Sequence, residues 1–337
     1  MTSVARPVAT RPALRAVLAS PRARAIAKAV AGFGILVAII AQAGADPFLR
    51  GLSAVSGQAV VAALVLAAIA TSAAAWRWRL IARGLEVPIG QAGAVAAYYR
   101  SQFLNTVLPG GVVGDVHRAV AHGRSVGRVG NASRAVAAER AAGQAVQVVL
   151  AAAVLAVAGL AAYAPAVGAV LLAVVVASVA LLVAAAASVR VRSALRRELA
   201  LVRGAFASTR VVAGVVVASV VVACHVATFV VAGVAVGLEA SPRTASVAVV
   251  AVLAGTIPLN VGGWGPREGV AGWAAAAVGF GSATGVAAST AYGVLAMIAV
   301  APGAAVVAAA ALTRRRGHAA VAVEIRPLAA PGEESSP

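Results

Sequence analysis

The chain has 337 residues, of which 62% are hydrophobic and only 11% are charged, and its mean hydropathy is +0.96. Apolar runs of about twenty residues, the length that a helix needs to cross a bilayer, recur from end to end. This composition excludes a soluble globular protein, and the absence of period-two alternation argues against an outer-membrane barrel. We therefore predict an all-α polytopic membrane protein.

The formal net charge of +18 does not indicate nucleic-acid binding, because the basic residues lie in short clusters between apolar runs. Such clusters set the orientation of a membrane protein and bind anionic lipid headgroups. The single cysteine, Cys224, offers neither a disulfide framework nor a cysteine-based metal site. We expect no nucleic-acid partner, no cofactor and no metal.

Lysine and arginine concentrate on the cytoplasmic side, so each loop can be assigned to one face of the membrane. Residues 1–28 form a basic segment that we expect to be a disordered cytoplasmic tail. A first span, about 29–45, leads out of the cell. A second, about 58–76, returns to a cytoplasmic loop that contains Arg77, Arg79 and Arg83.

The next apolar run, about 89–108, ends at a helix-breaking Pro109-Gly110-Gly111. Five arginines follow it before the next span, and all five would lie outside the cell if this run crossed the membrane. A re-entrant segment that dips in from the cytoplasm and turns back at the break removes the conflict. Broken backbone of this kind is tolerated at depth where it is buried in protein or faces a watery cavity.

The second half repeats this order in the opposite orientation. After a span at about 141–164, we predict spans at about 166–187, 211–237 and 287–312, with a second break, "GTIPLNVGGWGPREG", on the outer side. The prediction is an inverted repeat of about six spanning helices plus two re-entrant segments, with halves 29–164 and 165–312; the alternative is eight spanning helices. Residues 313–337 are expected to be a disordered cytoplasmic tail.

Paired Gly/Pro-interrupted segments in two inverted halves indicate the binding site of a transporter. Helix ends at such breaks present backbone N–H groups that can cradle a phosphate, and Arg118 and Arg267 would add forked hydrogen bonds to it. Asp115 and Glu268 follow the two breaks, where they can pair with these arginines, bind a cationic headgroup or take up a proton.

Polar residues within the apolar runs complete the candidate site. Glu139 and Arg140 begin a span and, with Gln144 and Gln147, form a polar stripe at helical spacing. His225 lies deep in an apolar run and is a secondary candidate. The full predicted substrate site comprises Asn105, Pro109, Gly110, Gly111, Asp115, Arg118, Glu139, Arg140, Asn260, Gly263, Gly265, Arg267 and Glu268.

The segments "FLNTVLPGGVVGDVHRA", "AAERAAGQ" and "IPLNVGGWGPREG" resemble the signatures of the lysylphosphatidylglycerol synthase transmembrane region family, also called the flippase-like domain family. The resemblance covers roughly residues 29–312. It implies an inner-membrane bundle that moves or presents polar lipids, with functional positions at Asn105, Pro109, Gly114, Asp115, Arg118, Glu139, Arg140, Gly263, Gly265, Arg267 and Glu268. The spacing "GGVVGD" departs from the family pattern and leaves the fit of the first loop open.

The expected function is translocation of an amphipathic phospholipid or polyprenyl-phosphate-linked lipid between leaflets, without enzymatic activity of its own. The expected partner is a lipid with an anionic headgroup, in an inner membrane where both termini are cytoplasmic. After Leu312 the sequence has too few residues for the aminoacyltransferase to which the best-known family members are fused. The alternative is a membrane scaffold or an accessory subunit that presents lipid to a separate aminoacyltransferase or glycosyltransferase.

Overall fold

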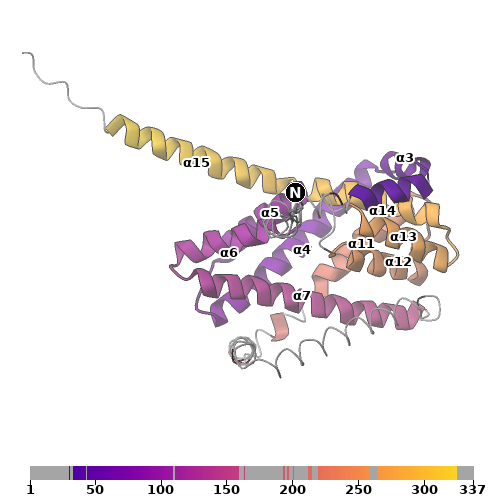
Figure 1. Ribbon diagram of the computed structural model, residues 1–337, viewed down its shortest axis with the longest axis horizontal. Helices are drawn as coiled ribbons and strands as arrows, with labels where there is room; N and C mark the ends of the chain where they lie inside the picture. The colour runs from indigo at the N-terminus through magenta and orange to yellow at the C-terminus, as the bar shows by residue number, and fades with distance from the viewer. Residues whose placement is uncertain are drawn as a thin grey trace, which may run out of the picture.

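Every element of the computed structural model is an α-helix within the residues that it describes, which are 30, 33–42, 44–108, 111–158, 163, 193, 196, 200, 212–214, 219–257 and 264–324 (Figure 1). The prediction of an all-α chain is confirmed. The helices are α3 (Asp46–Ser53), α4 (Gly57–Gly84), α5 (Gln91–Val107), α6 (Val113–Ser125), α7 (Val129–Ala158), α11 (Ser219–Ala235), α12 (Pro242–Ala254), α13 (Pro266–Ala277), α14 (Ser282–Ala299) and α15 (Pro302–Glu324).

Four helical stretches in the described part are long and apolar enough to cross a membrane: Gly57–Gly84, Val129–Val157, Val212–Ala235 and Ser282–Thr313. A fifth crossing is possible if Phe33–Gln42 and α3, which meet at an angle of 103°, count as one bent span. The chain is therefore a multi-pass membrane protein. The predicted span at about 166–187 lies outside the described residues, so the count of six stays a prediction.

A pair of short helices flanks each break. The first break is flanked by α5, with 17 residues, and α6, with 13, and the second by α12, with 13, and α13, with 12. Each helix is shorter than the roughly 20 residues that a perpendicular span requires. In the first pair Gly114 lies against Ser101 and Arg118 stacks on Tyr98, so α5 and α6 are antiparallel.

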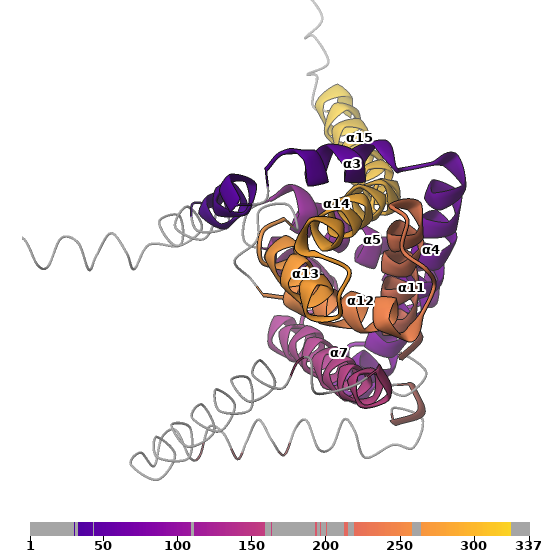
Figure 2. The same ribbon diagram turned by 90° about the vertical axis from the view of Figure 1, so that its right-hand side faces the viewer.

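The described part of the bundle has two hydrophobic cores. One core gathers α11 to α14 around Phe229, Val247 and Ala288. The other gathers α5 and α6 with parts of α4 and α7 around Trp78. Both α4 and α7 contribute residues to the two cores, and α4 lies beside α11 (Figure 2). The two pairs of short helices thus belong to different cores of one bundle.

Three helices extend past the boundaries predicted from charge. Helix α4 continues to Gly84 instead of ending near Trp76, so Arg77 lies in a helix and not in a loop. Helix α7 begins at Val129, well before the predicted start of that span. Helix α15 runs to Glu324, so residues 313–324 of the predicted tail are helical. In the extended parts of α4 and α7, Arg77, Glu139 and Arg140 form ion pairs within the bundle.

Candidate functional site

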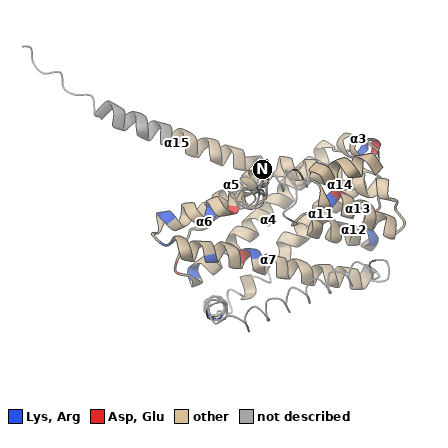
Figure 3. Ribbon diagram, viewed as in Figure 1, with Lys and Arg blue, Asp and Glu red and all other residues tan. Residues whose placement is uncertain are grey.

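A cavity of about 370 Å³ lies between the two breaks. The first break contributes Asn105, Gly111 and Asp115 to its lining, and the second contributes Gly255, Thr256 and Arg267. Charged residues occur on α6, on the adjoining part of α7 and at the start of α13, and a few more lie on α3 and α12 (Figure 3). The remaining polar lining residues are Arg77, Tyr98, Ser101, Gln102, Thr106, Glu139, Arg140, Gln144, Gln147, His225 and Tyr292.

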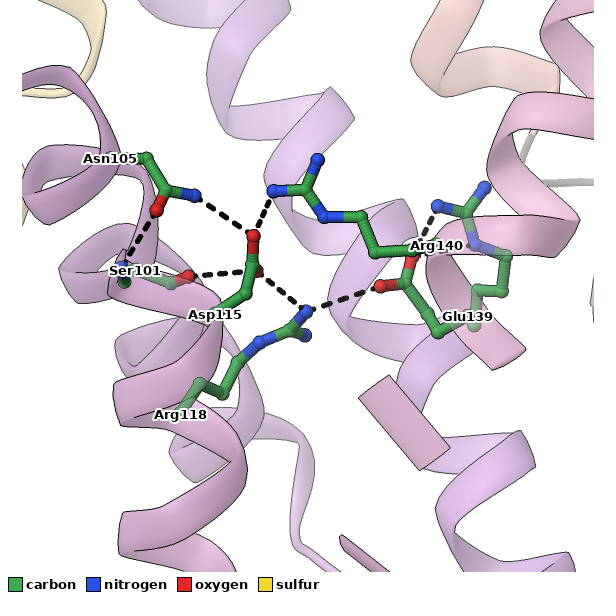
Figure 4. A network of polar contacts seen from close by, with 8 residues as sticks. Ser101, Asn105, Asp115, Arg118, Glu139 and Arg140 are labelled. Atoms are coloured by element: carbon green, nitrogen blue, oxygen red, sulfur yellow. Dashed lines mark hydrogen bonds and ion pairs between the residues drawn. The ribbon is translucent and has the colours of Figure 1, made fainter. Parts of the chain in front are cut away.

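Asp115 is the centre of the polar cluster at the first break (Figure 4). Its oxygens accept hydrogen bonds from Ser101 Oγ and Asn105 Nδ2, both at 3.0 Å, and from Arg118 at 3.1 Å. It also forms an ion pair with Arg140. Burial by itself raises the pKa of Asp115, but the two guanidinium groups and the Asn105 amide together hold it below its ordinary value. Asp115 is therefore a fixed anion.

Arg118 lies behind this cluster and not in the cavity lining. Its side chain is only 1% exposed, and its guanidinium carbon is 4.5 Å from the ring centre of Trp78 and 4.0 Å from that of Tyr98. Its terminal nitrogen donates to Asp115 and, at 3.2 Å, to Glu139. In this structure Arg118 holds two carboxylates in place and does not reach the cavity, where the sequence analysis expected it to bind phosphate.

Arg77 lines the cavity, although the sequence predicted only a residue of a cytoplasmic loop. It forms an ion pair with Glu139, with Nε at 3.0 Å from the carboxylate, and only 6% of it is exposed. Gly143 makes room for it, because a Cβ there would lie 2.8 Å from an Arg77 nitrogen. The sequence does contain a signal: the apolar residues Trp78, Ile81 and Leu85 continue at helical spacing past Arg77.

Glu268 organises the second break. It accepts hydrogen bonds from the Gly265 N–H at 2.7 Å, from Arg267 Nε at 3.0 Å and from Ser289 Oγ at 3.2 Å. Gly265 has a φ of 128°, which favours glycine, and the Glu268 carboxylate caps the first turn of α13. Arg267 also contacts Ser289 and lies 4.9 Å from the ring centre of Tyr292.

The two clusters are chemically alike. Each has a carboxylate at the third position of the helix that follows the break, an arginine beside it and a serine hydroxyl donating to it. In each, the arginine also lies against two aromatic rings, which are Trp78 and Tyr98 for Arg118 and Trp264 and Tyr292 for Arg267. Such stacking stabilises a desolvated guanidinium.

Two backbone N–H groups at the breaks have partners within the protein. The Gly114 N–H donates to Asn105 Oδ1 at 2.7 Å, and the Gly265 N–H donates to Glu268. These amides are thus not available to cradle a phosphate in this structure.

Of the other predicted site residues at the breaks, Gly111, which has a φ of 62°, lines the cavity. The predicted site residues Pro109, Gly110, Asn260 and Gly263 lie outside the described residues.

Helix α7 connects the two breaks through its polar stripe. Arg140 pairs with Asp115 at the first break, and Gln144 Nε2 donates to Thr256 Oγ1 at the second, at 3.0 Å. Arg140 and Gln144 are four residues apart in sequence. The contacts of α7 with the two breaks are therefore about one helical turn apart. His225 also reaches the cavity, and its Nδ1 lies 3.2 Å from the hydroxyl of Tyr292.

Residues 25–321 match the model of the lysylphosphatidylglycerol synthase transmembrane region. The chain belongs to this family. Searches of curated proteins and of solved structures gave no significant match. The matched unit is a transmembrane region and not a catalytic domain, and it associates this multi-pass protein with lipid modification or translocation.

Proposed function

We propose that this family member moves an amphipathic, phosphate-bearing lipid between the leaflets of the inner membrane, with its headgroup in the cavity between the breaks. It acts as a transporter and not as an enzyme. Both termini lie in the cytoplasm. Arg140 and Arg267 line the cavity and bind the phosphate. Arg77, which also lines it, and Arg118 hold the carboxylates in position.

The charge of the described site carries this proposal. Four guanidinium groups, those of Arg77, Arg118, Arg140 and Arg267, face three carboxylates, those of Asp115, Glu139 and Glu268. Among these seven groups, four minus three leaves one positive charge in a largely buried network. Uncompensated buried charge is costly, so such a site favours an anion that supplies one negative charge, as a phosphodiester does.

We propose that each pair of short helices is a re-entrant hairpin and that the two enter the bundle from opposite faces, as an inverted repeat. The lengths of α5, α6, α12 and α13 support this, as do the cavity that both breaks line and the separation of the pairs into two cores. The resulting site resembles those of transporters built from discontinuous helices.

Cysteine labelling tests the proposed topology. In a Cys224→Ser background, a cysteine replacing Ser125 should react only with membrane-permeant thiol reagents, and one replacing Ser282 should also react with impermeant reagents added to whole cells. Both serines are exposed at helix ends. Labelling of the Ser125 position by impermeant reagents would show that the first break belongs to a full crossing.

An Arg140→Gln substitution tests the site. Half of the Arg140 side chain is exposed, so the variant should fold, but it loses a charge-assisted contact to phosphate that contributes about 1.5–3 kcal/mol. In proteoliposomes, transfer of a fluorescent phospholipid to the outer leaflet, read by a membrane-impermeant quencher, should slow at least about tenfold.

The matched control is Arg128→Gln. Arg128 also pairs with a carboxylate, that of Glu86, but both side chains are largely exposed at 51% and 75%, and neither lines the cavity. This variant should transport at the rate of the unmodified protein. Equal slowing in both variants would argue against a role for Arg140 in binding phosphate.

The second candidate function is presentation of lipid to a separate transferase, which the family's association with a synthase favours. The same proteoliposomes distinguish the two. A presenting subunit would bind the phospholipid but would transfer no more of it between leaflets than protein-free vesicles do.

A further inference from the structure

We propose that the cavity selects a phosphodiester monoanion whose headgroup carries uncharged hydroxyl groups, and that it rejects a headgroup bearing an additional ammonium group. This inference rests on the proposed transport of a phosphate-bearing lipid and names the class of headgroup. Two sources share this chemistry: a glycerophospholipid with a polyol headgroup and a polyprenyl-phosphate-linked sugar.

The carboxylates of the described site pair with donors of the protein itself, which disfavours an ammonium group. An ionised carboxylate accepts about four hydrogen bonds. Asp115 receives four donors, from Ser101, Asn105, Arg118 and Arg140. Each lone-pair site of this central anion is thus occupied by the protein itself.

The other two carboxylates are buried and paired. Glu268 is 0% exposed, does not line the cavity and accepts the Gly265 N–H, two nitrogens of Arg267 and the Ser289 hydroxyl. Glu139 is 1% exposed and accepts two nitrogens of Arg77 and one of Arg118. An ammonium group entering this cavity would meet a net positive charge and carboxylates that already pair with guanidinium groups, which disfavours binding.

Uncharged polar side chains supply the remaining contacts. Gln102, Asn105, Thr106, Gln144, Gln147 and Thr256 line the cavity. Gln147 is only 6% exposed, and its amide nitrogen has no hydrogen-bond partner. A buried donor without a partner is costly, and a hydroxyl oxygen of the headgroup would satisfy it. This donor is the feature of the cavity that favours a polyol.

The test uses the purified full chain in proteoliposomes with tail-labelled phosphatidylglycerol, lysyl-phosphatidylglycerol or a polyprenyl phosphosugar in parallel. Lysyl-phosphatidylglycerol differs from phosphatidylglycerol by an aminoacyl group that adds positive charge. We expect phosphatidylglycerol, the phosphosugar or both to move at least about tenfold faster than the lysyl lipid, and the faster of the two identifies the source.

Two other outcomes would contradict the proposals, and they are distinguishable. Transport of the lysyl lipid at the same rate or faster would overturn the headgroup inference while leaving lipid transport intact. Transport of none of the three above the rate in protein-free vesicles would instead overturn the proposed function.

A Gln147→Leu variant tests the proposed donor. Loss of one hydrogen bond of about 1 kcal/mol should weaken the binding of short-chain phosphatidylglycerol about fivefold. Displacement of a labelled short-chain phosphatidylglycerol from the detergent-solubilised protein measures this affinity without relying on transport. Gln58→Leu, at an exposed position of α4, should leave the affinity unchanged. An unchanged affinity in the Gln147 variant would overturn its assignment.

Discussion

Replacing Glu139 by glutamine is expected to lower the free energy of unfolding by about 3–5 kcal/mol, the cost of breaking a buried ion pair by removing one partner. Glu139 is 1% exposed and holds the guanidinium groups of Arg77 and Arg118. Glutamine has nearly the same shape but no charge, so two arginines would lose their shared buried counterion. The resulting instability comes from the charge and not from altered packing.

The measurement can use Cys224, which is the single cysteine of the chain and is buried. A thiol-reactive fluorophore added to detergent-solubilised protein during heating would report unfolding as this thiol becomes accessible. The control is Glu86→Gln, which removes the carboxylate of an exposed pair with Arg128. That change should cost less than about 1 kcal/mol. Similar shifts in Tm for both variants would contradict the role assigned to Glu139.

An alanine at Gly114 is expected to destabilise the protein by about 1–3 kcal/mol and to impair transport. A Cβ at this position would overlap the carbonyl oxygen of Ser101 and would lie 2.7 Å from its carbonyl carbon. Both atoms are backbone and cannot turn aside, so α5 and α6 must move apart. That movement would displace Asp115, the next residue, from Ser101 and Asn105.

The matched control is Gly57→Ala. Gly57 is also a helical glycine, but no atom lies within 4 Å of the Cβ that alanine would add. Helix propensity predicts a gain of up to about 1 kcal/mol for this change. A Gly114→Ala protein with unchanged Tm and unchanged lipid transfer would show that the close approach of α5 and α6 is not required.

The helical membrane class could be predicted from composition alone, because so apolar a chain must satisfy its backbone within helices. The breaks could be located because proline and glycine act locally on the backbone, and short helices do flank them. Asp115 and Arg118, and likewise Arg267 and Glu268, are close in sequence, so their pairing could also be anticipated.

Long-range pairing could not be predicted. The topology prediction assumes that each arginine lies in an exposed loop. Arg77 instead pairs with Glu139, 62 positions away in sequence, and both residues are buried. For the same reason Arg118 was assigned to a phosphate, although Trp78 and Tyr98 enclose it. Only the packing of α4, α6 and α7 against one another decides which arginines face the cavity and which support it.

The division of the bundle into two cores bears on how the protein could move. Arg77, Arg118 and Arg140 pair with Asp115 and Glu139 beside one core, and Arg267 pairs with Glu268 beside the other. A rotation of one core relative to the other would therefore leave these ion pairs intact. It would break the Gln144–Thr256 hydrogen bond, a neutral contact of about 1 kcal/mol, and would bend α4 and α7 where they pass between the cores. Within the described residues, such an opening of the cavity would break no ion pair.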